Sequence, residues 1–113
     1  MKKIIKSFIY AVNGIQYTVF TQVNFCIQIA MLLLVIIAGV LFDINKLEWL
    51  IIIFTSGTVL ALELVNTAFE ALVDLTTQEY SELAKKAKDI AAGAVLMMSI
   101  VSVIIGLIIF IPY

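Results

Sequence analysis

The chain has 113 residues, of which 64% are hydrophobic and 13% charged, with a net charge of −1 and a mean hydropathy of +1.17. Such an apolar composition predicts a single-domain, all-α integral membrane protein. The basic residues are all lysines and form no patch suited to nucleic acid, the absence of histidine excludes histidine-based catalysis, and a single cysteine, Cys26, excludes an intrachain disulfide.

The N-terminal segment, residues 2–24, is predicted to be an amphipathic helix at the membrane interface. Apolar residues recur in it at helical spacing, and its first residues include three lysines that suit the anionic headgroups of the cytoplasmic leaflet. The apolar set is Ile4, Ile5, Phe8, Ile9, Val12, Ile15 and Val19, and the polar set is Lys2, Lys3, Lys6, Asn13 and Gln16.

Three further segments are long and apolar enough to cross a bilayer, at residues 25–42, 47–75 and 90–111. The first and third carry no charge, and the third opens with small residues, AAGA, that allow close helix approach. The polar connection 76–89 is expected to be helical only near its end.

The lysines predict the orientation of these spans. Three lie in the N-terminal segment and three in the connection before the third span, whereas the first connection has only Lys46. Because cytoplasmic loops carry the excess of basic residues, the N-terminus is predicted to be cytoplasmic and the C-terminus to lie outside.

The most informative stretch is residues 60–75, where an otherwise apolar helix carries Glu63, Asn66, Glu70 and Asp74. Their spacing places the four side chains within an arc of about 80° on one helix face. Glu63 lies about 16 Å from Asp74 along the axis, deep in the membrane. Ionisable groups at this depth are costly, which favours a functional role, although a helix–helix hydrogen bond is the structural alternative for Glu63 and Asn66.

The chemistry of this face suits a reaction between a nucleotide and a lipid. Glu70 and Asp74 offer hard oxygen ligands for Mg²⁺, while Lys88, beside Asp89 at the start of the third span, offers a cation for phosphate. Glu63 lies where only a membrane-dissolved substrate reaches, and burial suits a carboxylate to take a proton from an alcohol.

The runs ALELVNTAFEALVDL and EYSELAKKAKDIAAGAVL closely resemble the small prokaryotic diacylglycerol kinase/undecaprenol kinase family, without gaps from about Lys3 to the C-terminus. The resemblance implies a homotrimer in the bacterial cytoplasmic membrane that uses MgATP to phosphorylate a lipid alcohol. The segment IIGLIIFIP is more similar to the undecaprenol branch than to the diacylglycerol branch.

The same resemblance implies roles for individual residues. Glu63 corresponds to the catalytic base, and Asn66 to a neighbour that orients the base or the phosphate. Glu70 corresponds to a metal ligand that also contacts the nucleotide, and Asp74 to a supporting acid. The remaining positions that match nucleotide contacts are Lys3, Lys6, Tyr10, Asn13, Glu79, Lys88 and Asp89.

One region departs from the family pattern. Gln22 stands where an acidic residue usually shares the metal with the helix glutamate, and Gln28 stands where a histidine often occurs. Gln22 still offers a carbonyl oxygen to Mg²⁺, but without the negative charge. This departure leaves an inactive homologue that binds a membrane partner as one alternative, and a small proton-coupled multidrug transporter is the other.

Overall fold

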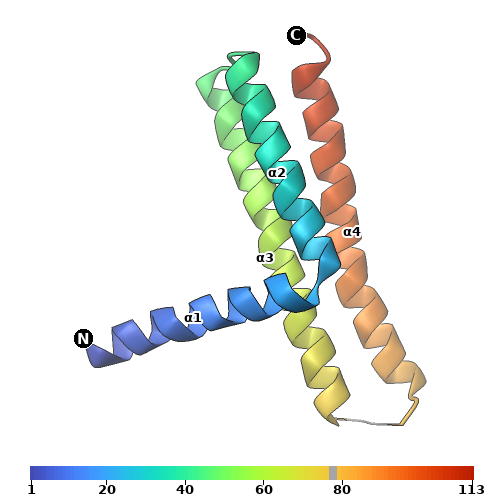
Figure 1. The fold of residues 1–113 in the computed structure, drawn as a ribbon. Helices are drawn as coiled ribbons and strands as arrows, with labels where there is room; N and C mark the ends of the chain where they lie inside the picture. Colours follow the sequence, from blue (N-terminus) through green and yellow to red (C-terminus); the bar gives the residue numbers. More distant parts are fainter. Residues whose placement is uncertain (77–78) are drawn as a thin grey trace.

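The computed structural model of the chain describes residues 1–76 and 79–113, which form four α-helices (Figure 1). The three helices α2, α3 and α4 stand side by side, and each is long and apolar enough to cross a membrane by length and composition. The predicted all-α architecture with three candidate spans is therefore confirmed. The helices are α1 (Lys2–Thr21), α2 (Val23–Leu41), α3 (Lys46–Thr76) and α4 (Glu82–Phe110).

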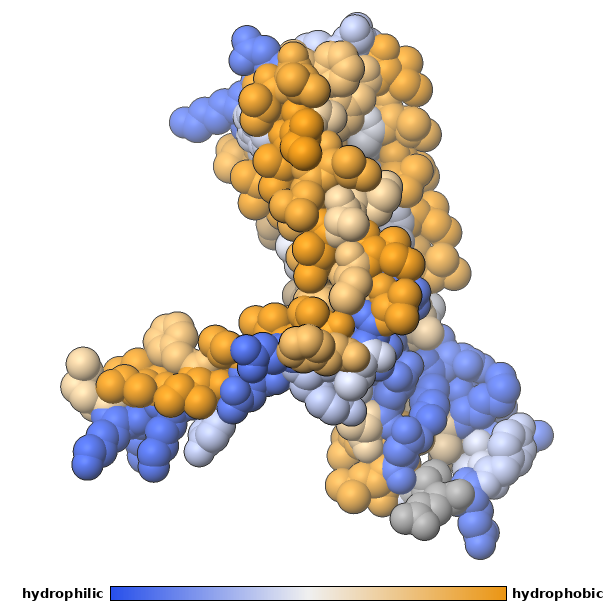
Figure 2. All heavy atoms as spheres, in the orientation of Figure 1, coloured by the Kyte–Doolittle hydropathy of each residue, from blue (hydrophilic) through white to orange (hydrophobic). Residues whose placement is uncertain are grey.

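Helix α1 projects sideways from the bundle and meets α2 at Gln22 (Figure 1). The extended backbone of Gln22, with φ −117° and ψ 105°, breaks the helix, so α1 ends before the predicted residue 24 and α2 begins at Val23 rather than residue 25. Figure 2 shows hydrophobic residues along one side of α1 and hydrophilic residues along the opposite side.

Helix α4 begins well before the predicted residue 90. Ser81 has extended backbone, and its hydroxyl oxygen accepts a hydrogen bond from the amide N–H of Ala84 at 3.3 Å. This N-cap satisfies one of the free amides at the helix start. The polar residues from Glu82 to Asp89 therefore form the opening turns of α4, so the helix predicted near the end of this connection is continuous with the third span.

The turn between α2 and α3 is closed by reciprocal capping. The Asn45 side-chain oxygen accepts the Glu48 N–H at 2.9 Å, and a Glu48 carboxylate oxygen accepts the Asn45 N–H at 3.1 Å. The hydroxyl of Tyr113 donates to the same Glu48 oxygen, and this hydrogen bond raises the pKa of the Tyr113 phenol. The C-terminus is thereby tied to the start of α3.

The small buried core lies at this same end of the bundle. Ile44, Ile52 and Ile109 are buried together, with Val35, Trp49, Ile105 and Phe110 packed against them. Most other large apolar side chains are exposed, and they cover the three-helix bundle in Figure 2. Such a surface is suited to lipid rather than water.

Gly39 on α2 lies directly against the Trp49 ring at the start of α3. A Cβ atom there would lie 2.6 Å from the Trp49 ring, so no larger residue fits without displacing the indole. We expect Gly39→Ala to destabilise the protein by about 1–3 kcal/mol through overpacking.

Thermal unfolding in detergent, followed by circular dichroism, measures this loss. Gly57→Ala on α3 is the matched control, because a Cβ atom at Gly57 would have nothing within 4 Å. Equal melting temperatures for the two variants would contradict the assigned Gly39 contact.

Candidate functional site

The polar face of α3 runs from the protein interior to the exposed end of the helix. Glu63 is 2% exposed and Asn66 is 7% exposed, whereas Glu70 is half-buried and Asp74 is exposed. The two deeper side chains are thus enclosed by protein within a span, and the two outer ones are accessible from the end where the lysines of α4 gather.

The Glu63 side chain is hydrogen-bonded to a residue of α2. The Gln28 Nε2 donates a hydrogen bond to the Glu63 Oε2 at 3.3 Å, and the Thr67 hydroxyl donates to the Glu63 backbone carbonyl at 2.9 Å. Sequence reasoning assigned no role to Gln28. The sequence signal for Gln28 was its polar side chain within an otherwise apolar span.

Two amide oxygens beside Glu63 lack partners. The Oε1 of Gln28 and the Oδ1 of Asn66 are both buried, and neither accepts a hydrogen bond from any residue that the structure describes. Asn66 lies on the same face of α3 as Glu63, one turn away. An unpaired buried acceptor is costly, so this centre is suited to receive hydrogen-bond donors such as a hydroxyl group.

The outer end of the site joins α3 to α4. The Lys88 ammonium forms an ion pair with the Asp74 carboxylate, and the Lys85 ammonium pairs with Asp89 at 2.7 Å within α4. Hydrophilic residues gather at this end in Figure 2. The structure therefore brings Asp74 and Lys88 together, whereas the predicted neighbours Lys88 and Asp89 make separate pairs.

The predicted nucleotide contacts of α1 are not gathered with the others in a single chain. Lys3, Lys6, Tyr10 and Asn13 are exposed along α1, which extends away from the ends of α3 and α4 (Figure 1). Glu79 is exposed just before α4. The predicted nucleotide contacts therefore lie on separate elements of the chain.

The donor set fits Mg²⁺ only as part of a metal–nucleotide complex. Within residues 1–76 and 79–113, no cluster of three or more cysteine and acidic side chains could hold a metal ion. Glu70 offers a half-buried carboxylate on α3, and Gln22 offers a carbonyl oxygen at the α1–α2 junction. Mg²⁺ is commonly held by one or two carboxylates together with phosphate and water, which suits this arrangement.

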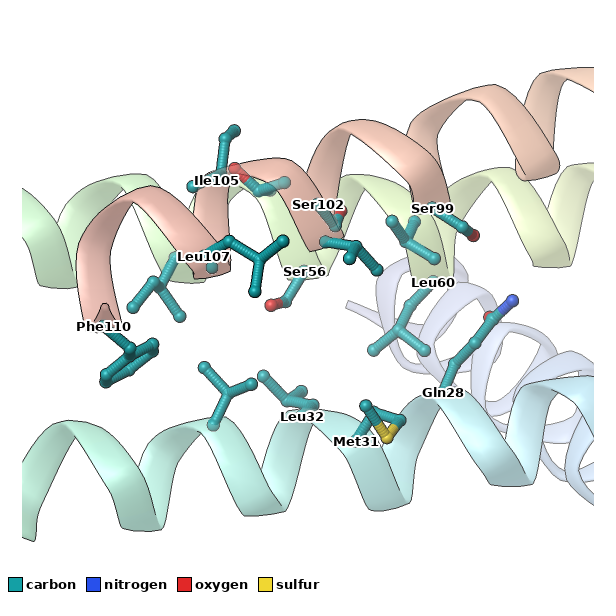
Figure 3. A pocket seen from close by; sticks show the side chains of 16 residues that line it. Gln28, Met31, Leu32, Ser56, Leu60, Ser99, Ser102, Ile105, Leu107 and Phe110 are labelled. Atoms are coloured by element: carbon teal, nitrogen blue, oxygen red, sulfur yellow. The ribbon is translucent and has the colours of Figure 1, made fainter.

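A cavity of about 410 Å³ lies between α2, α3 and α4 (Figure 3). Its walls are mostly apolar, and it extends from Gln28 at one end to Phe110 at the other. The other polar residues in its lining are Thr55, Ser56, Ser99 and Ser102. Gln28 thus contacts both the buried carboxylate and an apolar space at membrane depth. Such a space fits a hydrocarbon chain better than a polar solute.

Comparison with known proteins identifies a matching family and several similar proteins. Residues 9–110 match the family described as prokaryotic diacylglycerol kinase. The undecaprenol kinase of Bacillus subtilis (strain 168) is 45% identical over 112 residues, which cover 99% of this chain and 91% of that protein.

Two diacylglycerol kinases are also similar. That of Synechocystis sp. is 48% identical over 88% of this chain but only 58% of its own length, so the chain spans little more than half of that relative. That of Escherichia coli (strain K12) is 31% identical over 90% of this chain and 84% of its own length.

Proposed function

Because the chain belongs to the prokaryotic diacylglycerol kinase family, we propose that it transfers the γ-phosphoryl group of ATP to the hydroxyl of a membrane lipid alcohol, undecaprenol or diacylglycerol. The observation that carries this proposal is the position of Glu63, a buried carboxylate between an apolar cavity and the ion-paired end of α3 and α4. Neither a transporter nor an inactive homologue is favoured by the family match.

The chemistry begins at Glu63. The lipid hydroxyl lies against Glu63 and donates its O–H to the carboxylate, and the neighbouring Asn66 carboxamide helps to orient it. As the hydroxyl oxygen attacks the γ-phosphorus, its proton passes to the Glu63 carboxylate, the new O–P bond forms, and the bond to ADP breaks. The lipid tail occupies the cavity between the three spans.

The nucleotide lies towards the outer end of the same face. Glu70 and Gln22 would hold Mg²⁺, which would supply positive charge to neutralise the phosphates. Lys88 exchanges its ion pair with Asp74 for the nucleotide phosphates, and the freed Asp74 carboxylate would support the Mg²⁺ site. Asp89 and Glu79 contact the nucleotide beside Lys88.

The complete enzyme is a homotrimer in the bacterial cytoplasmic membrane. The N-terminus is cytoplasmic, the C-terminus lies outside, and α1 rests on the cytoplasmic surface with its lysines towards the headgroups. A neighbouring protomer brings Lys3, Lys6, Tyr10 and Asn13 to the nucleotide, since α1 extends away from the ends of α3 and α4 within its own chain. The separation of α1 from the ends of α3 and α4 supports this arrangement.

Replacement of the neutral metal ligand provides a test of the metal shell. We expect Gln22→Glu to lower the Mg²⁺ concentration that gives half-maximal activity, because a carboxylate binds Mg²⁺ more strongly than a carboxamide does. The measurement is a Mg²⁺ titration at fixed ATP, with Gln16→Glu on α1 as the control for added charge. An unchanged titration would place residue 22 outside the metal shell.

A competition assay tests the function and identifies the lipid. Purified protein in lipid nanodiscs receives γ-labelled MgATP with undecaprenol and diacylglycerol in equal amounts, and the labelled lipids are separated. Label in either phosphorylated lipid supports the kinase, and its distribution ranks the substrates. Absence of label from both lipids would favour the inactive homologue.

A further inference from the structure

Gln28 occupies a singular position in the site, because it belongs to α2 but contacts the proposed base on α3. Its Nε2 makes the one hydrogen bond that the side-chain oxygens of Glu63 have among the described residues. Its Oε1 is buried and has no partner there. The nitrogen of this carboxamide is therefore hydrogen-bonded, and its oxygen accepts no hydrogen bond from the described residues.

A general base has opposite hydrogen-bonding needs before and after it takes a proton. A carboxylate only accepts hydrogen bonds, whereas a carboxylic acid also carries an O–H that needs an acceptor. Glu63 is buried away from bulk water, so the surrounding side chains must meet both needs. A carboxamide contains one donor group and one acceptor group, and a half-turn about its terminal torsion exchanges them.

We infer that Gln28 is a positioning residue that holds Glu63 in place in both of its protonation states. In the resting site, Nε2–H donates to the Glu63 carboxylate, as observed. When the proton of the lipid hydroxyl has moved to Glu63, the carboxamide turns and Oε1 accepts the new O–H. The proton leaves to water with product release, and the carboxamide returns. This inference rests on the proposed kinase function.

Substitutions that remove or keep the two hydrogen-bonding groups test the inference. Gln28→Met has similar length but offers Glu63 no comparable donor, so kcat should fall about 10- to 100-fold. The KM for MgATP should stay unchanged, because Gln28 contacts Glu63 and not the outer end of the site. Gln28→His should recover most of the loss, since a neutral imidazole has one donor and one acceptor nitrogen.

Leu33→Met is the matched control, because Leu33 lies on α2 as Gln28 does but is exposed and does not line the cavity. Its kcat should stay within about twofold of the wild type, as expected for a volume-conserving exchange. A purely structural role for Gln28 predicts instead that the His variant is no better than the Met variant. That outcome, or a Gln28→Met enzyme with wild-type kcat, would overturn the inference while leaving the kinase intact.

Failure of the proposed function has a different signature. A wild-type protein that phosphorylates neither alcohol, or a Glu63→Gln variant with wild-type turnover, would overturn the kinase or base assignment and this inference together.

Discussion

Glu63→Gln is expected to lower kcat by about 100- to 10,000-fold, the range that general-base catalysis contributes. The substitution replaces one carboxylate oxygen with an amide nitrogen of similar size, so it removes the proton acceptor while preserving the volume of the buried side chain. Because Gln28 can turn to present either its donor or its acceptor, the amide at residue 63 also keeps a hydrogen-bond partner. The measurement is steady-state phosphorylation of the preferred lipid alcohol.

Glu48→Gln, the same exchange near the start of α3, provides the control. Glu48 caps the helix and contacts Tyr113, remote from the proposed reaction centre. Glu48→Gln should retain turnover close to that of the wild type. Size-exclusion profiles of both variants should match the wild type. Normal turnover by Glu63→Gln would show that another group accepts the proton.

Lys88→Met is expected to lower kcat/KM for MgATP by about 100- to 1,000-fold, the cost of removing one donor that stabilises a developing anion. The substitution should lower kcat/KM while leaving the stability of the folded protein nearly unchanged. Lys88 and Asp74 form an ion pair near the exposed ends of their helices, and such pairs contribute little to stability.

Lys86→Met is the matched control for Lys88→Met, because Lys86 lies in the same turn of α4 and is exposed. We assign it no contact with the nucleotide. If both substitutions reduced kcat/KM equally, the effect would reflect the general positive charge of this end of α4. If Lys88 itself contacts the phosphates, only Lys88→Met should lower kcat/KM for MgATP strongly.

Hydropathy and periodicity were sufficient to predict the class and the number of candidate spans, because runs such as CIQIAMLLLVIIAGVL are too long and apolar for another setting. They could not locate the helix ends, which depend on local backbone. The break at Gln22 carries no proline or glycine, and the cap at Ser81 lies inside a polar segment that resembles a loop.

The candidate site was predictable where it follows one helix. The spacing of Glu63, Asn66, Glu70 and Asp74 sets their common face through helix geometry alone. Contacts between helices were not predictable, because they depend on how α2, α3 and α4 pack. The Gln28–Glu63 hydrogen bond, the Asp74–Lys88 ion pair and the apolar cavity all belong to this second kind.

The most direct test of the account follows the phosphoryl group itself. Wild-type protein and Glu63→Gln, reconstituted side by side in nanodiscs with undecaprenol, receive ATP labelled at the γ-phosphate, and the lipid fraction is extracted. We expect label in the lipid with the wild type and almost none with Glu63→Gln. Equal labelling by the two proteins would contradict the assignment of the buried carboxylate as the base.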